Sequence, residues 1–181
     1  MTIQLEIPTL ETARLTLRAF RAADVEPMHR LMQDPEVMRF VGDRRMPSEQ
    51  DSWRAVAGWI GHWALRGYGQ WAVTERDGGE VVGRAGVINP QGWPGAEVGY
   101  LLGKSWWGRG YASEAARAAV DWAFRERGFD RLLSLIDPDN AASIRVAERL
   151  GETLRGETQL WEHTVLMYAI DRVDWEARRA G

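Results

Sequence analysis

The sequence contains no cysteine, and this absence removes several classes of chemistry. A chain without a thiol has no cysteine nucleophile, no disulfide framework and no cysteine-ligated zinc. Histidine is scarce as well. The three histidines, His29, His62 and His163, are scattered without the spacing of metal ligands, and we expect each to be a surface or packing residue. The sequence therefore predicts no metal site.

Long apolar runs and an excess of one charge are also missing. No stretch approaches the ~20 apolar residues that span a membrane, and the first ten residues lack the basic and apolar regions of a signal peptide. The net charge of −3 provides no basic field for nucleic acid. We therefore expect a cytoplasmic protein without nucleic-acid or membrane partners. A homodimer is possible, but no feature of the sequence decides it.

The composition is that of an ordinary globular protein. The chain has 181 residues, of which 45% are hydrophobic and 27% charged, and this is enough for one domain with a full core. There is no repeat, linker or low-complexity segment. We predict a single domain over residues 1–181, with its core at roughly 9–171.

Hydrophobic periodicity predicts alternating helices and strands. Asp24 and Ser48 stand where the N-caps of the first two helices would lie, and Gly67, Gly128 and Gly151 stand where helices would end. The predicted helices cover residues 24–33, 48–67, 111–127 and 141–150, and the segment 34–47 is expected to be a loop or a short helix. The predicted strands cover 14–20, 70–75, 81–88, 96–102, 131–136 and 163–172. This order indicates an α/β (α+β) domain in which about four helices flank a mixed, mostly antiparallel sheet.

The segment "LLGKSWWGRGYASEA" (101–115) is rich in glycine and leads directly into the third predicted helix. It lacks the spacing of a P-loop because position 98 is valine, and it lacks the dinucleotide fingerprint because position 113 is serine. The order Trp107-Gly108-Arg109-Gly110 fits the pyrophosphate loop of acyl-CoA-dependent acetyltransferases. A plain turn between strand and helix explains the loop equally well.

Two stretches in register resemble the GNAT acetyltransferase superfamily. They are "EVGYLLGKSWWGRGYASEAARAAVDWAF" (97–124) and "IDPDNAASIRVAERLG" (136–151). With "ETARLTLRAF" near the start, the chain looks like the branch that contains the ribosomal-protein N-acetyltransferases. The resemblance implies a GNAT fold with two splayed parallel strands. It also implies acetyl-CoA as cosubstrate and direct transfer of its acetyl group to an amine.

The resemblance places the pyrophosphate of acetyl-CoA at the glycine-rich loop. The glycines would let the backbone approach the diphosphate, and the amide groups at the helix N-terminus would point at its oxygens. An arginine can reach a phosphate. At Trp107 the superfamily usually has Gln or Arg, so the role of this side chain is not carried over. The cofactor-binding residues implied here are Trp107, Gly108, Arg109, Gly110, Tyr111, Ala112 and Ser113.

The second stretch implies two further site residues. Asn140 matches the superfamily asparagine beside the pantetheine, and it is also a favoured N-cap. Ser143 matches the serine of the branch and would donate a hydrogen bond to the thioester or the leaving sulfur, or satisfy the first helical turn. Many GNAT enzymes have a tyrosine seven residues after the asparagine as general acid, but here that position is Ala147.

Glu97 is the predicted general base, because the acceptor amine must lose a proton before it attacks. The residue begins the strand that leads to the loop, and strand alternation puts Gly99 on the same face, where it leaves room for a substrate. A surface charge is the alternative reading. The backbone of Leu101 and Leu102 is expected to pair with the pantetheine amides. Ser134 and Tyr168 are secondary catalytic candidates.

The sequence does not identify the acceptor. The predicted walls of its pocket are the segment 34–47 and four tryptophans, Trp53, Trp59, Trp63 and Trp93. Two other functions remain open at this point. One is a non-catalytic acyl-CoA binder, which the absent tyrosine favours. The other is a different nucleotide-binding module, which the absent phosphate-loop spacings argue against.

Overall fold

A computed structural model describes residues 5–160 and 162–180, and these form an eight-stranded sheet with helices on both faces. The strand order is β1-β2-β3-β4-β5-β6-β8-β7. The pair β5–β6 is parallel, and the other neighbouring pairs are antiparallel. The strands are β1 (Leu10–Glu11), β2 (Leu15–Arg18), β3 (Gln70–Glu75), β4 (Val81–Ile88), β5 (Glu97–Leu102), β6 (Arg131–Ile136), β7 (Thr153–Leu160) and β8 (His163–Asp171).

The described helices divide into those predicted and those missed. The predicted ones are α1 (Val25–Met32), α3 (Glu49–Arg66), α4 (Tyr111–Glu126) and α5 (Ala141–Leu150). The segment 34–47, expected to be a loop or a short helix, contains the short helix α2 (Pro35–Met38), and the structure adds the C-terminal helix α6 (Arg172–Ala180). None of the helices in the described ranges is long and apolar enough to cross a membrane. The α/β prediction with a mixed, mostly antiparallel sheet is confirmed.

Capping signals set the helix ends where the sequence indicated them, with one exception. Ser48 and Asp51 form a capping box at the start of α3, and Gly67 ends that helix with φ +73°. Asp24 occupies the predicted N-cap position of α1, but its side chain makes no cap hydrogen bond to that helix. Asp24 instead lies buried in an ion pair with Arg18, at 2.7 Å.

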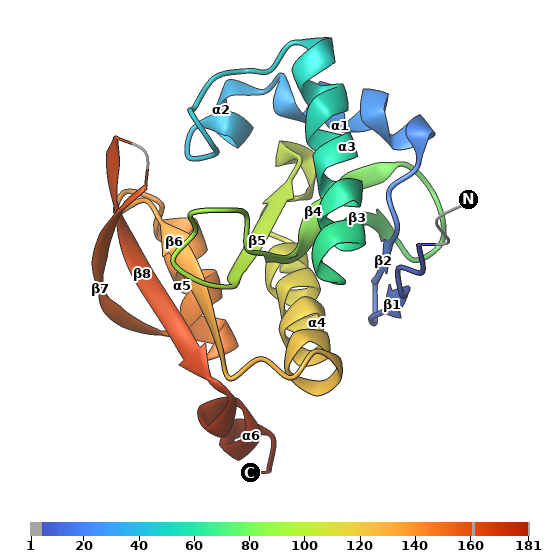
Figure 1. Cartoon of the computed structure of the whole chain (residues 1–181). Coiled ribbons are helices and arrows are strands. Elements are labelled where there is room, and N and C mark those ends of the chain that lie inside the picture. The colour runs from blue at the N-terminus through green and yellow to red at the C-terminus, as the bar shows by residue number, and fades with distance from the viewer. Residues whose placement is uncertain (1–4, 161, 181) are drawn as a thin grey trace.

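Two apolar layers hold the helices to the sheet. On one face, α4 contributes an alanine-rich stripe that packs closely against β4 and β5, with Phe124 buried at its end. On the other face, α1, α2 and α3 bury methionines and valines over β3 and β4, together with Leu101 of β5. Figure 1 shows α3 and α4 on opposite sides of the central strands.

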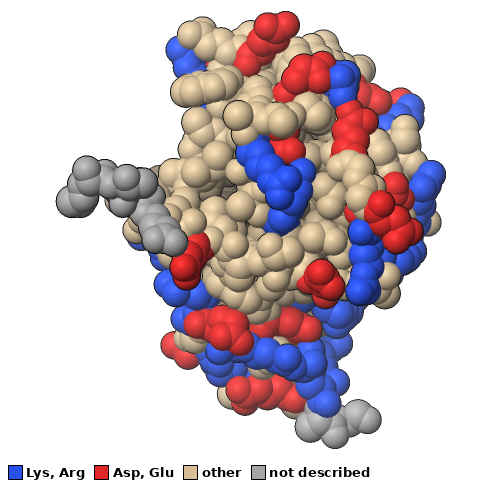
Figure 2. Space-filling view, turned by 90° about the vertical axis from the view of Figure 1, so that its right-hand side faces the viewer, with Lys and Arg blue, Asp and Glu red and all other residues tan. Residues whose placement is uncertain are grey.

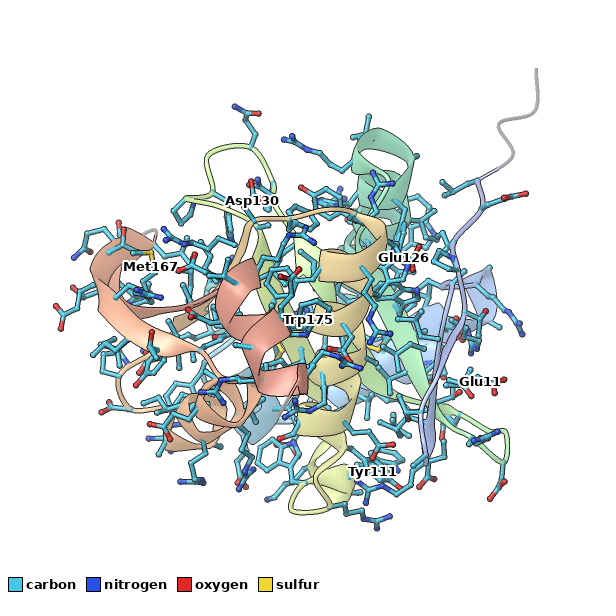
Figure 3. The ribbon with its side chains drawn as sticks, turned by 90° about the horizontal axis from the view of Figure 1, so that it is seen from below. Glu11, Tyr111, Glu126, Asp130, Met167 and Trp175 are labelled. Carbon is cyan, nitrogen blue, oxygen red and sulfur yellow. The ribbon has the colours of Figure 1, made fainter. Side chains whose placement is uncertain are left out.

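The helix α6 returns the C-terminal end of the described chain to α4. Figure 3 shows Trp175 beside α4, which runs from Tyr111 to Glu126. The Trp175 indole donates a hydrogen bond to Asp121 at 2.7 Å, and its ring lies 5.1 Å from that of Phe124. This packing explains why so polar a segment becomes a helix.

Candidate functional site

The two parallel strands diverge immediately after they meet. Their pairing in the described residues is limited to Glu97 of β5 opposite Leu133 of β6. Figure 1 shows β6, β8 and β7 turning away from β5. At the divergence lies a cavity of about 310 Å³, lined from β4, β5, β6 and α5 and from the loops at residues 40–44 and 90–93. The predicted splay therefore exists, and a cavity is placed at it.

Backbone alternation decides which groups of β5 face the opening. The carbonyl oxygens of Ala96 and Val98 point to β6, since the first accepts from the Leu133 amide at 2.9 Å and the second lies 3.5 Å from the Ser134 hydroxyl oxygen. The Leu101 carbonyl instead lies against Gly83 of β4. The even-numbered residues Tyr100 and Leu102 therefore present their backbone groups to the open edge. The backbone of Leu101 belongs to the β4–β5 ladder, and Tyr100 takes its place among the open groups.

Glu97 lies at the point of divergence and lines the cavity. Its Oε2 accepts a hydrogen bond from the Trp93 indole at 2.5 Å, and the Leu135 amide also donates to the carboxylate. Burial raises the pKa of Glu97, while Trp93, the positive charge of Arg84 and Leu135 act in the opposite direction. A carboxylate with a raised pKa is a better proton acceptor near neutral pH. The surface-charge reading is therefore not favoured.

A row of polar groups continues from Glu97 across the same face of the sheet. Gly99 and Gly86 are paired on β5 and β4, and Gln70 of β3 pairs with Gly86. A Cβ on Gly99 would lie 3.1 Å from the Gln70 Nε2 and 3.6 Å from an Arg84 nitrogen. The room that the sequence predicted beside Gly99 is thus filled by these two side chains.

The glycine-rich loop has the backbone geometry that the hypothesis of a diphosphate-binding loop requires. Gly108 and Gly110 have φ of +75° and +80°, and both are exposed. Gly110 is the N-cap of α4, and the first helical hydrogen bond of α4 in this turn runs from the Glu114 amide to the Gly110 carbonyl. The amide groups of Tyr111, Ala112 and Ser113 therefore lack helical acceptors.

Ser113 gives this helix start an unusual feature. Its hydroxyl oxygen is buried and has no hydrogen-bond partner among the described residues. Buried hydroxyl groups are normally hydrogen-bonded, and an unpaired one indicates an absent partner. Three unpaired amides and one unpaired hydroxyl at a helix N-terminus fit a phosphate group.

The other side chains of the loop hold it in place. The Trp107 indole donates to the Leu102 carbonyl at 2.8 Å, which ties the loop back to β5. Arg14 of the segment before β2 donates to the Arg109 carbonyl at 2.8 Å and pairs with Glu114. The Tyr111 hydroxyl donates to Glu75 at 2.7 Å. Arg109 remains exposed, with its guanidinium 3.9 Å from Glu75.

Helix α5 follows β6 along the chain and lines the cavity near its N-terminus. Asn140 is its N-cap, and the side-chain oxygen accepts from the Ser143 amide at 3.1 Å, so the capping role is confirmed. Both residues line the cavity. The Tyr100 hydroxyl donates to the Ser143 carbonyl at 3.3 Å and so joins β5 to α5. Ala147 is fully buried beside Tyr168 and Ile136 and has no access to the cavity.

The two secondary candidates differ in position. Ser134 lines the cavity and donates to Glu152 at 3.1 Å. Tyr168 pairs with Ser134 across β6 and β8, but its side chain packs in the apolar cluster under α5. Burial raises the pKa of Glu152 to about 8.

The predicted aromatic walls are correct in part. Trp93 lines the cavity, and so do Phe40, Val41 and Arg44 from the segment 34–47. Trp63 is 2% exposed and packs edge-to-face on Trp71, so it belongs to the core. Trp53 is 60% exposed and lies outside the lining. Helical periodicity puts tryptophans on one stripe without distinguishing core from surface.

Of the predicted wall residues, Trp59 also lies outside the lining, and its ring packs 5.1 Å from the Arg84 guanidinium.

Several lining residues were missed by sequence reasoning. Arg84 was not singled out because its strand carries no motif, and Tyr100 was not singled out although it lies within the stretch 97–124. His163, expected to be a packing or surface residue, contributes to the lining from the start of β8. The pairing of β3, β4 and β5 brings Arg84 to the cavity, with Gln70 next to it, and this pairing is not visible in one sequence.

The charges on the molecular surface are mixed. On the face shown in Figure 2, Lys and Arg side chains alternate with Asp and Glu side chains, and neither sign forms a continuous area. This face offers no extended basic surface.

Comparisons with known proteins agree with this geometry. The acetyltransferase (GNAT) domain model matches residues 14–153. A protein of Bacillus licheniformis named as an N-acetyltransferase is 30% identical over 145 residues, which cover 78% of this chain and 80% of the relative. An acetyltransferase structure from Agrobacterium tumefaciens is 33% identical, covers 94% of this chain and 98% of its own, and superposes with a TM-score of 0.83.

A third comparison comes from the ribosomal-protein branch. The structure of the ribosomal-protein acetyltransferase RimL, in complex with coenzyme A, is 25% identical. It covers 91% of this chain and 98% of its own, with a TM-score of 0.75. The family match spans more than half of the chain, from β2 to the start of β7, and includes both stretches that carried the resemblance. The chain therefore belongs to the GNAT acetyltransferase family, and it is an N-acetyltransferase.

Proposed function

We propose that the protein transfers the acetyl group of acetyl-CoA to a primary amine, either a protein N-terminus or a small molecule, by direct attack in a ternary complex. The observation that carries this proposal is the placement of Glu97 in the cavity at the divergence of β5 and β6. The unpaired groups at the start of α4 lie at the far end of the same strand, where β5 leads into the loop.

Four groups of this chain fit the cosubstrate. The unpaired amides of α4 and the Ser113 hydroxyl would receive the diphosphate. The open backbone of Tyr100 and Leu102 would pair with the pantetheine amides, although the Leu102 carbonyl is taken by Trp107 and leaves only the amide free. Asn140 and Ser143 flank the point where the strands separate. Acetyl-CoA supplies the acetyl group as an activated thioester.

Glu97 would remove the proton from the ammonium form of the acceptor. Its carboxylate lies in the cavity, is oriented by Trp93 and Leu135, and has a pKa raised by burial. The neutral amine can then attack the thioester carbonyl. Ser143 would donate a hydrogen bond to the departing sulfur, and no general acid is required since a thiolate is a stable leaving group. Because the chain has no cysteine, no thiol-linked acetyl-enzyme is formed.

Release of free thiol from acetyl-CoA in the presence of a panel of primary amines tests the proposal. We expect wild-type protein to release thiol with at least one amine and to yield one acetylated product per thiol. The Glu97→Gln variant should be slower by about 10²–10⁴-fold. A protein that binds acetyl-CoA but releases no thiol with any amine would be a non-catalytic binder, and the proposal would be wrong.

A further inference from the structure

Arg84 lines the cavity, Gln70 lies next to it at Gly99, and both have polar atoms without a hydrogen-bond partner among the described residues. Gln70 is 1% exposed, and both its amide oxygen and its amide nitrogen lack hydrogen-bond partners among the described residues. The Nε of Arg84 is also buried and unpaired within the described chain. Such groups are costly to bury without hydrogen bonds, and they indicate an absent partner.

The sheet is built to keep these two side chains together. Gly86 and Gly99 sit opposite each other on β4 and β5. The absence of a side chain at Gly99 makes space for the Gln70 and Arg84 side chains, and Gly86 lets the backbone of Gly69 and Gln70 approach closely. Trp59 supports the guanidinium from α3, with a separation of 5.1 Å from its ring. Arg84 reaches the cavity that Glu97 also lines. A half-buried cation and a half-buried anion thus share one cavity without a hydrogen bond between them in the described structure.

The second arginine of the cavity is already paired. Arg44 forms an ion pair with Asp137, and both line the cavity. The charges that remain for a ligand are therefore one positive group, Arg84, and one negative group, Glu97. A ligand with one ammonium and one singly charged anionic group would give each of them a partner. The planar guanidinium fits a carboxylate with two parallel hydrogen bonds.

The other residues that line the cavity indicate whether the body of the ligand is polar or apolar. They include Phe40, Val41, Ile88, Trp93 and Leu160, and so they are largely apolar. We propose that the acceptor is an amino compound that also carries a carboxylate and an apolar body, such as a hydrophobic amino acid, and that Arg84, with Gln70 beside it, binds this carboxylate. The proposal rests on the proposed acetyl transfer and names the class of acceptor.

A matched set of acceptors tests it. Leucine, methionine, phenylalanine and tryptophan are compared with their amides, which keep the amine and the apolar body but lack the negative charge. Wild-type protein should show a kcat/KM, corrected for the fraction of neutral amine, at least tenfold higher for an amino acid than for its amide. Arg84→Met should remove this preference, and Arg84→Lys should keep part of it.

Arg44→Met is the control variant, because it removes a positive charge from the same cavity while leaving Arg84 in place. We expect it to retain the preference for the carboxylate. If Arg84 serves only to lower the pKa of Glu97, Arg84→Met will slow all acceptors equally and leave the ratio of amino acid to amide unchanged. That result, or the same loss of preference in Arg44→Met, would overturn the proposal.

A binding measurement separates failure of this proposal from failure of the proposed function. The unfolding temperature is measured in saturating CoA with each amino acid or its amide. The amino acids should raise the unfolding temperature of wild type more than their amides do. In Arg84→Met, an amino acid and its amide should raise it by the same small amount. If amines are acetylated without any preference for a carboxylate, only the acceptor class is wrong. If no amine is acetylated, the proposed function is wrong, and the binding preference alone decides whether Arg84 holds a carboxylate.

Discussion

Replacing Glu152 with Gln should change how the stability of the protein depends on pH. Glu152 is 3% exposed, one of its oxygens accepts from Ser134 at 3.1 Å, and the other has no partner among the described residues. Burial raises the pKa of this carboxyl from 4.5 to about 8, a change that Ser134 opposes and the negative charge of Glu97 increases. The folded protein therefore holds a proton that the unfolded chain releases at neutral pH.

The sign of the effect follows from this difference in bound protons. Between pH 4.5 and about 8 the folded state binds more protons at Glu152 than the unfolded state, so the free energy of unfolding falls as pH rises. The stabilising contribution is complete below pH 4.5 and is lost as pH passes through about 8. The slope is at most about 1.4 kcal/mol per pH unit, which amounts to roughly 3 kcal/mol between pH 5.5 and 8.

Urea unfolding of wild type and Glu152→Gln over this pH range measures the effect. The variant cannot titrate at this position, so it should gain stability relative to wild type as pH rises. Glu97 is present in both proteins, and its own titration largely cancels in the comparison. Glu148→Gln, a change at an exposed glutamate of α5, should leave the wild-type pH dependence unaltered. Parallel stability curves for wild type and Glu152→Gln would refute the reasoning.

Three further predictions concern the base, the cosubstrate and the C-terminal helix. The turnover of Glu97→Gln should approach that of wild type as pH rises from 6 to 9, because more of the amine is already deprotonated. A Glu97→Gln variant with wild-type turnover across that range would show that Glu97 is not the base. Acetyl-CoA at about 100 times its dissociation constant should add ~2.7 kcal/mol to stability, a rise of roughly 5–10 °C in unfolding temperature, and an equal rise with NAD would contradict this. Trp175→Ala should destabilise the fold by about 3–4 kcal/mol in urea unfolding, whereas Val173→Ala, at an exposed position of the same helix, should cost less than about 0.5 kcal/mol; equal costs would show that α6 is not anchored through Trp175.

Most of the framework follows from local patterns in the sequence. The capping box at Ser48, the terminal glycine at Gly67 and the alanine stripe of α4 each determine a helix by short-range interactions, and the structure confirms these predictions. The strands β3 to β6 were predicted because they alternate or form short apolar runs. Motif register then indicated which loop and which two strands form the site.

The missed elements depend on long-range contacts instead. Strand β7 is largely exposed and polar, and it forms a strand because it pairs with β8. Helix α6 is also polar, and its fold depends on the contact of Trp175 with α4. In the same way, strand register brings Arg84 to the cavity and Gln70 next to it, and a single sequence does not reveal this register.

Calorimetric titration of acetyl-CoA into wild type, Gly110→Val and Gly128→Val tests most directly whether the loop and the start of α4 hold the cosubstrate. Gly110 and Gly128 have φ of +80° and +70° at the two ends of α4, so valine should strain the backbone by about 1–2 kcal/mol at either position. Only Gly110→Val places a side chain at the start of α4, where its Cβ would lie 3.4 Å from an Arg14 nitrogen. We predict that acetyl-CoA binds wild type and Gly128→Val with similar affinity and Gly110→Val at least tenfold more weakly. Unchanged affinity in a folded Gly110→Val protein would show that this loop is a plain turn and would contradict the account.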